Sequence, residues 1–203
     1  MAGLILAGGR SRRFGRDKAF EKLNDKPLID YVVEALAPVA GNLIVVADSA
    51  ERFVDHDGRF TIVTDEVPGL GPLGGLYAGL KAAPDRYSIV APCDSPFIDT
   101  GLVEYMLKTA ADANVDALVP RYEGREHTVN AVYSKACVPA IDSSLNDGLF
   151  RISSIFDKIR VQYIDDDTIN KFAGGGLSFF NVNTPENMDE AGRILRERGG
   201  LNG

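Results

Sequence analysis

Five short apolar runs recur along the chain, and their spacing constrains the fold more than any other feature of the sequence. The runs are Leu4–Leu6, Leu43–Val46, Ile62–Val63, Ser88–Ala91 and Ala117–Val119. They are continuous rather than alternating, which is typical of strands buried on both faces of a parallel sheet. Two later segments, Val129–Tyr133 and Val161–Ile164, are predicted to add strands.

Helical patterns separate these runs. Pro27 is predicted to be a first helical residue, a second helix is expected over Leu73–Ala83, Thr100 is expected to cap a third, and a last helix is expected to start at Thr184. Strands that alternate with crossover helices predict an α/β fold, a three-layer α/β/α sandwich with a mostly parallel sheet. Residues 124–176 show the least pattern.

Length and composition agree with one globular unit. The 203 residues are 45% hydrophobic and 25% charged, and neither a linker nor a repeat is visible, so a single domain over residues 1–203 is predicted. No apolar stretch approaches the roughly 20 residues of a membrane span. Cys93 and Cys137 lack metal-ligand or redox spacing and are expected in the core of a protein from a reducing compartment, the cytoplasm.

The net charge of −7 argues against nucleic acid and against an anionic membrane surface as partners. One segment breaks this trend, because Arg10, Arg12, Arg13, Arg16 and Lys18 stand against the single acid Asp17. A basic loop on an acidic body indicates a small polyanion as ligand. The alternative is a solvated surface loop without a ligand.

The basic segment directly follows the first apolar run. Leu6 and Ala7 lead into Gly8 and Gly9, and paired glycines after a buried strand let backbone N–H groups converge on an anion. Ligands of such sheets sit at the carboxyl ends of the strands. The segment has neither the G-x-G-x-x-G nor the G-x-x-x-x-G-K-[ST] pattern, so it indicates a phosphate cradle without indicating a nicotinamide dehydrogenase or a P-loop ATPase.

The run LAGGRSRRFGRDKAF, followed by NDKPL, resembles the N-terminal signature of the nucleotidyltransferases that build the molybdenum cofactor dinucleotide, and the molybdenum cofactor guanylyltransferases most closely. Phe14 stands where Met is usual in this family. Three further segments resemble family motifs in the family's order: Asp65 with GPLxGL over residues 71–76, PCD-x-P over residues 92–96, and N-x-N-T-P over residues 181–185. The resemblance therefore extends through nearly the whole chain.

This resemblance implies a Rossmann-like nucleotidyltransferase sheet and transfer of GMP from GTP to the phosphate of molybdopterin or of the molybdenum cofactor, with release of pyrophosphate. Transient contacts with other cofactor-biosynthesis proteins are also expected. The resemblance implies that Asp94 binds Mg²⁺, and that Asn181 and Asn183 face the pterin. The nucleotide is then expected to contact Leu6, Ala7, Gly8, Gly9, Arg13, Lys18 and Asp65. Lys18, Arg13 and Asp94 are the expected catalytic residues.

Several alternatives remain at the level of sequence. Asp94 also suits a turn before Pro96, the two asparagines suit turn and cap positions, and the glycines of GPLGGL suit close packing of a helix on the sheet. Ala47 stands where the guanylyl enzymes carry an Asn, and the neighbouring Asp48 is either an acceptor for guanine or a solvated acid. Cytidylyl transfer, sugar-phosphate nucleotidylyl transfer and a non-catalytic nucleotide-binding module are the alternative functions.

Overall fold

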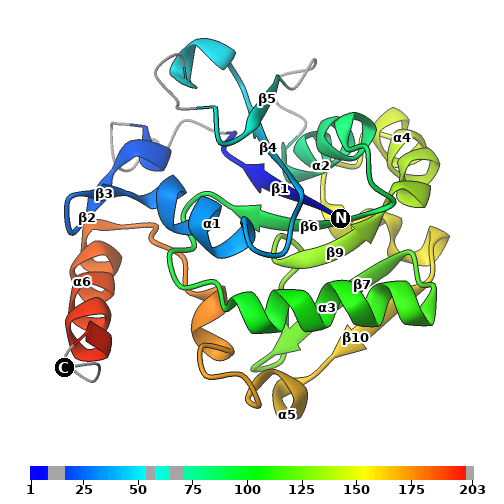
Figure 1. The fold of residues 1–203 in the computed structure, drawn as a ribbon. Coiled ribbons are helices and arrows are strands. Elements are labelled where there is room, and N and C mark those ends of the chain that lie inside the picture. The colour runs from blue at the N-terminus through cyan, green and yellow to red at the C-terminus, as the bar shows by residue number, and fades with distance from the viewer. Residues whose placement is uncertain (9–16, 54–57, 65–70, 200–203) are drawn as a thin grey trace.

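A single large sheet with helices on both faces organises the protein (Figure 1). The computed structural model describes residues 1–8, 17–53, 58–64 and 71–199. Within this part of the chain the strand order is β10-β7-β9-β6-β1-β4-β5, with β8 paired to β7. The strands are β1 (Ala2–Leu6), β4 (Asn42–Ala47), β5 (Thr61–Thr64), β6 (Tyr87–Pro92), β7 (Ala117–Tyr122), β8 (Arg125–Glu126), β9 (Ala131–Ser134) and β10 (Val161–Ile164), beside a separate hairpin of β2 (Lys22–Leu23) and β3 (Lys26–Pro27).

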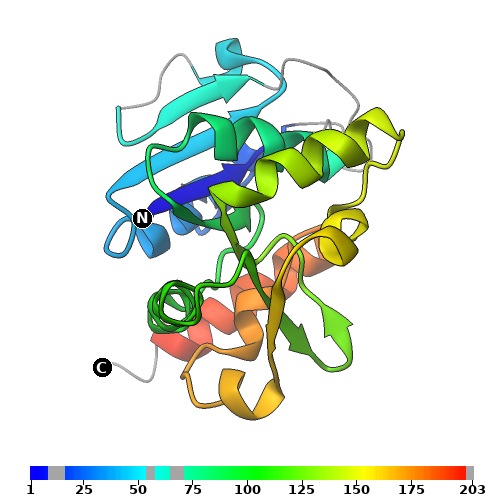
Figure 2. The same cartoon turned by 90° about the vertical axis from the view of Figure 1, so that its right-hand side faces the viewer.

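The helices form the two outer layers. The α-helices are α1 (Leu28–Leu36), α2 (Gly71–Ala82), α3 (Thr100–Ala113), α4 (Val138–Asn146), α5 (Asp166–Ile169) and α6 (Pro185–Gly199), and the 3-10 helices are η1 (Lys18–Phe20), η2 (Ala50–Phe53), η3 (Lys135–Cys137), η4 (Ile152–Lys158) and η5 (Gly176–Phe179). Apolar residues of α1 and α3 pack on one face of the sheet, and those of α2 and α4 pack on the other (Figures 1 and 2). The predicted three-layer sandwich is confirmed.

Strand direction decides which loops meet. β1 pairs in parallel with β4 and β6, β4 pairs in parallel with β5, and β10 pairs in parallel with β7. β9 is antiparallel to both β6 and β7. The carboxyl ends of β1, β4 and β6 therefore share one edge with the amino end of β9, and the segment that enters β9 lies at the edge where ligands of such sheets bind.

The predicted elements were mostly right, but their boundaries needed correction; the second helix, expected over Leu73–Ala83, is α2 at Gly71–Ala82. The strand expected over Val129–Tyr133 begins two residues later, at Ala131. Asp99 rather than Thr100 caps α3, because its carboxylate accepts a hydrogen bond from Leu102 N at 2.8 Å, while the Thr100 hydroxyl donates to Ala35 O of α1. Pro27 precedes α1 as its N-cap instead of forming its first turn.

Close packing against the sheet explains two of the glycines of α2. A Cβ added at Gly79 would lie 2.9 Å from Leu4 Cδ1 and 3.2 Å from Val46 Cγ2, and one at Gly75 would lie 3.3 Å from Leu6 Cδ2. The backbone of α2 therefore approaches β1 and β4 more closely than a larger residue allows. This favours the packing role for Gly75 over a role in ligand binding.

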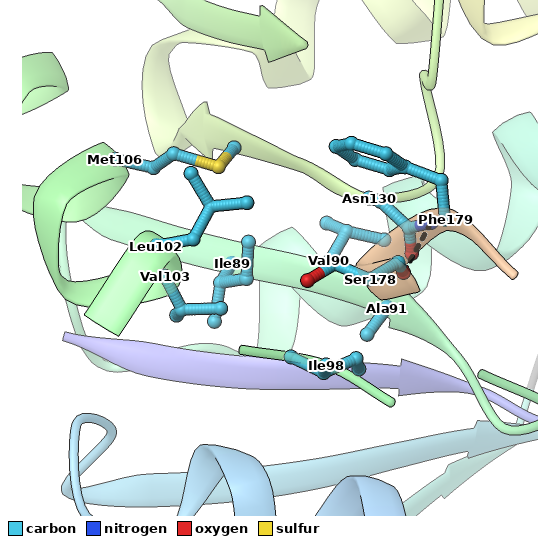
Figure 3. Close-up of a pocket in the computed structure, with 10 residues that line it drawn as sticks. All are labelled: Ile89, Val90, Ala91, Ile98, Leu102, Val103, Met106, Asn130, Ser178 and Phe179. Carbon is cyan, nitrogen blue, oxygen red and sulfur yellow. Dashed lines mark hydrogen bonds between the residues drawn. The ribbon is translucent and has the colours of Figure 1, made fainter. Parts of the chain in front are cut away.

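One cavity lies inside the core, between β6, α3 and η5 (Figure 3). It has a volume of about 20 Å³ and a mostly apolar lining that includes Ile89, Leu102 and Met106. Asn130 reaches its wall and donates to Ser178 O at 3.5 Å. This volume suffices for a single water molecule and is too small for a substrate, so the cavity itself is not a substrate site. Among the described residues, no helix is both long and apolar enough to cross a bilayer.

We expect Gly79→Ala to lower the free energy of unfolding by about 1 kcal/mol, because overpacking at β1 and β4 outweighs the gain in helix propensity. Gly192→Ala in α6 is the matched control. Its Cβ would meet only Arg196 Nη1, at 3.5 Å, among the described atoms, so it should stabilise the protein by roughly 0.5–1 kcal/mol. Urea unfolding measures both changes, and equal effects of the two substitutions would contradict the packing argument.

We also expect both cysteines to resist alkylation in the folded protein. Cys93 and Cys137 are buried free thiols, and burial raises the pKa of each to about 12. Because the thiolate is the reactive form, iodoacetamide at pH 8 should leave the native protein unmodified by mass spectrometry and modify both residues in guanidinium chloride. Rapid labelling of the native protein would show that one thiol is accessible.

Candidate active site

The site lies where β1, β4 and β6 end. Hydrogen bonds continue past the strands, from Ala7 N to Val46 O at 2.8 Å and from Cys93 N to Leu6 O at 3.1 Å. Leu6, Ala7 and Gly8 are thereby placed at the sheet edge beside the segment that carries Asp94. Gly9, Arg13 and Asp65 lie outside the described residues, so their predicted roles stay predictions.

Lys18, Asp94 and Asn183 meet at this edge, although they are far apart in the sequence. The Lys18 ammonium donates to Asp94 Oδ2 and, at 2.7 Å, to Asn183 Oδ1. The side chains of Lys18 and Asp94 are each only 13% exposed. Limited contact with water strengthens such an ion pair compared with one on the open surface. Three residues that the sequence singled out thus form one cluster.

The second carboxylate oxygen of Asp94 is a candidate metal ligand. Oδ1 is buried and has no hydrogen-bond partner among the described residues. A buried carboxylate oxygen without a partner is costly, and a divalent cation satisfies it. No group of three or more His, Cys, Asp or Glu side chains within the described ranges forms a metal cage. The described residues therefore suit a cation that takes one carboxylate from this part of the protein and further ligands from phosphates and water, as Mg²⁺ commonly does.

The two asparagines of the late motif contact different parts of the same cluster. Asn183 meets Lys18, whereas Asn181 Oδ1 accepts a hydrogen bond from the Ser95 hydroxyl. Between them, Val182 is buried and its N–H donates to Asp94 O at 2.9 Å. The α6 backbone is capped by the Thr184 hydroxyl, which accepts from Asn187 N at 3.3 Å. The asparagine side chains are therefore not needed as caps for that helix.

Arg52 is a component of the site that the sequence did not reveal. It follows β4 in η2 and binds Asp17 through two nitrogens, Nε to Oδ2 and Nη2 to Oδ1, both at 2.6 Å. Its Nη1 donates to Ala7 O at 2.7 Å and to Asp48. Asp48 is therefore engaged in an ion pair. A lone arginine five residues after a strand carries no recognisable pattern, and only the fold brings it to Asp17.

A larger pocket lies near the cluster of Lys18, Asp94 and Asn183, where β7 ends and the chain enters β9. Its volume is about 610 Å³. Its wall is formed by Tyr122, Glu123, Arg125, His127, Asn170, Phe172, Ala173, Gly174, Gly175, Gly176, Leu177, Phe179 and Phe180. We call it the β7–β9 pocket. Phe180 directly precedes Asn181, so the pocket adjoins the Lys18–Asp94 cluster through the chain.

Aromatic rings and a glycine run shape the β7–β9 pocket. The His127 ring stacks on Phe179 with centroids 4.1 Å apart, and burial lowers the pKa of His127, which favours the neutral ring. A Cβ at Gly176 would lie 2.4 Å from Tyr122 Oη, and one at Gly175 would lie 2.1 Å from Ile169 O. The pocket wall therefore requires glycine at position 175, whereas a larger residue at position 176 would displace the Tyr122 ring. The run Gly174–Gly176 is a sequence signal that could have indicated this wall, but the sequence analysis drew nothing from it.

Comparisons with known proteins agree with this geometry. The chain matches the family of MobA-like NTP transferase domains over residues 3–161. It is 34% identical over 195 residues to the probable molybdenum cofactor guanylyltransferase of Pelotomaculum thermopropionicum, covering 96% of this chain and 93% of that protein. It is 31% identical over 197 residues to the molybdenum cofactor guanylyltransferase of Desulfosudis oleivorans, covering 97% of this chain and 96% of that protein.

Solved structures also resemble this chain. The molybdopterin-guanine dinucleotide biosynthesis protein A of Archaeoglobus fulgidus superposes with a TM-score of 0.85 at 26% identity, covering 97% of this chain and all of that one. The 2-C-methyl-D-erythritol 4-phosphate cytidylyltransferase of Thermus thermophilus shares the fold, with a TM-score of 0.70 over 96% of this chain and 98% of that one, at 18% identity. The chain belongs to the MobA-like NTP transferase family, as an enzyme of its molybdenum cofactor guanylyltransferase group.

Proposed function

We propose that the protein transfers GMP from GTP to the terminal phosphate of molybdopterin or of its molybdenum-loaded form and releases pyrophosphate. The proposal rests chiefly on one observation, the meeting of Lys18, Asp94 and Asn183 at the carboxyl edge of β1 and β6. The names of the relatives support the choice of GTP and of the acceptor.

The chemistry requires alignment more than a reactive side chain. The acceptor phosphate is itself the nucleophile, so the transfer needs no Ser, Cys or His attack. Catalysis then comes from positioning of the two phosphates and from neutralisation of the charge that develops between them. We propose that the backbone of Gly8 and the ammonium of Lys18 hold the triphosphate, together with Gly9 and Arg13, whose roles come from the sequence.

Lys18 and Asp94 each keep bonding capacity for a ligand. An ammonium group has three donors, and Lys18 uses two of them within the described part of the site. Its flexible stem allows the charge to move from Asp94 to an arriving phosphate. We propose that Asp94 holds Mg²⁺, which when bound would neutralise charge on the α-phosphate and the pyrophosphate. The unpartnered Oδ1 supports this assignment.

The β7–β9 pocket suits the acceptor. Its stacked rings offer a flat apolar surface to a heterocycle, and Arg125, Glu123 and Asn170 supply polar groups at its rim. We propose that the pterin lies here and that its phosphate extends past Asn181 towards Lys18. Nucleotide and acceptor then approach from opposite sides of Asp94, which is the geometry that transfer between two phosphates requires.

Asp94→Asn should abolish pyrophosphate release while the protein remains folded, because a neutral amide holds a divalent cation poorly. The assay combines GTP, Mg²⁺ and molybdopterin and follows pyrophosphate with a coupled enzyme. Asp112→Asn is the control, since Asp112 lies exposed on α3 and pairs with Lys108. Wild-type turnover by Asp94→Asn would refute the assignment of Asp94, and preference of the unmodified protein for CTP or ATP over GTP would refute guanylyl transfer.

Asn181→Ala and Asn183→Ala should each raise the KM for the acceptor by roughly two- to tenfold, the equivalent of one hydrogen bond. The affinity for GTP, measured by calorimetry without acceptor, should stay near that of the unmodified protein. Asn42→Ala provides the control, because Asn42 bonds Asp85 at the opposite end of β4. Weaker GTP binding with unchanged use of the acceptor would assign the asparagines to the nucleotide instead.

A further inference from the structure

Arg52 joins three elements of the nucleotide side through one guanidinium group. It makes four hydrogen bonds within the described part of the chain, two to Asp17, one to Ala7 O and one to Asp48. The guanidinium fork matches the two carboxylate oxygens of Asp17, which is the geometry that makes arginine pairs directional. The side chain of Arg52 is 20% exposed, so the network is partly shielded from water.

A continuous series of contacts leads from this network to Lys18. Ala7 is fixed by its N–H bond to Val46 O, and its own carbonyl receives Arg52 Nη1. Arg52 then holds both oxygens of Asp17, and Asp17 Oδ1 also accepts from Ala19 N at 3.2 Å. Asp17 is thus the N-cap of η1, and Lys18 is the first residue of that helix. The backbone of Lys18 thus lies in a helix whose cap residue is bonded by Arg52, while the Lys18 ammonium contacts Asp94 and Asn183.

A second contact joins the same two helices but does not fix the cap. Phe20 of η1 packs on Phe53 of η2 with ring centroids 5.0 Å apart. Ring packing is not directional enough to set the rotation of a neighbouring carboxylate, whereas two hydrogen bonds from one planar group are. The apolar contact therefore holds η1 near η2, and the ion pair orients the Asp17 carboxylate that caps η1.

The ordinary alternative is that Arg52 forms a surface ion pair of little consequence. Exposed pairs contribute about 0–1 kcal/mol and have no preferred partner atoms. Arg52 differs in three respects: its pairing with Asp17 is bidentate, it also binds the main-chain carbonyl of Ala7 after β1, and it joins these two segments to its own, where it pairs with Asp48. These are features of a group that fixes a geometry.

We infer that Arg52 is a positioning residue for Lys18 and, through it, for the triphosphate of the nucleotide. The inference rests on the proposed function, because Lys18 is taken to bind GTP. Arg52 itself contacts the protein rather than the ligand in this arrangement. Loss of Arg52 should therefore weaken GTP binding only as long as Lys18 is present to be misplaced.

The test is a double-mutant cycle on GTP affinity. We expect Arg52→Ala to raise the Kd for GTP about tenfold, or about 1.4 kcal/mol. Arg52→Lys keeps the charge without the fork and should resemble Arg52→Ala more than the unmodified protein. In a Lys18→Ala background, either Arg52 substitution should change the Kd by less than about twofold, because residues that act through one another are not additive. Arg160→Ala, which removes an exposed arginine paired with Asp116, should leave the Kd unchanged.

The outcomes separate this inference from the proposed function. If the unmodified protein does not bind GTP, or if Lys18→Ala binds it normally, the proposed function fails first. Suppose that Lys18→Ala weakens GTP binding and that Arg52→Lys raises the Kd by the same factor with and without Lys18. Arg52 then acts independently of Lys18, and the inference is wrong. Unfolding of both Arg52 variants would also contradict the inference, since Arg52 would then serve the fold rather than the position of Lys18.

Discussion

The hydrogen bonding of β1 between its two parallel neighbours is the constraint on which the site depends. Because β4 and β6 flank β1 in the same direction, three chain segments leave the sheet at one edge. Ladder bonds that continue through Ala7 and Cys93 hold these segments together beyond the strands themselves. The positions of Gly8, of the Arg52 network and of Asp94 follow from this alignment, so the described polar groups of the site are placed by backbone hydrogen bonds in a buried sheet.

Ion pairs between side chains hold together the segments that the backbone brings to this edge. Lys18 and Asp94 balance each other in a poorly hydrated position, while Asp17 and Asp48 balance Arg52. Each charge thus has a protein partner before any ligand arrives, which limits the cost of keeping ionised groups out of water. In the proposed function, binding of a triphosphate with a cation would be an exchange of partners within this set, and an exchange costs less than the desolvation of bare charges.

The sequence predicted local features well and distant contacts only in part. Continuous apolar runs identified the buried strands, because a parallel sheet covered on both faces leaves them no polar side. The resemblance also selected Lys18, Asp94, Asn181 and Asn183 before the structure brought them together. Arg52 was missed because its partners are set by the turn after β4, and the β7–β9 pocket was missed because its wall comes from short elements between residues 124 and 176. Such elements are stabilised by tertiary packing and leave little periodicity in the sequence.

The antiparallel direction of β9 has a consequence for how such an enzyme can evolve. The loop that enters β9 belongs to the pocket rim, and hydrogen bonds described for it go to Pro120 of β7 and to Asp166 of α5 rather than to Lys18, Asp94 or Asn183. Insertions or exchanges between Glu123 and Asn130 can therefore alter the shape of one half of the site without moving the other. A fold with this division lets natural variation, or an engineer, redesign the recognition of one substrate while the chemistry of phosphate transfer is inherited intact.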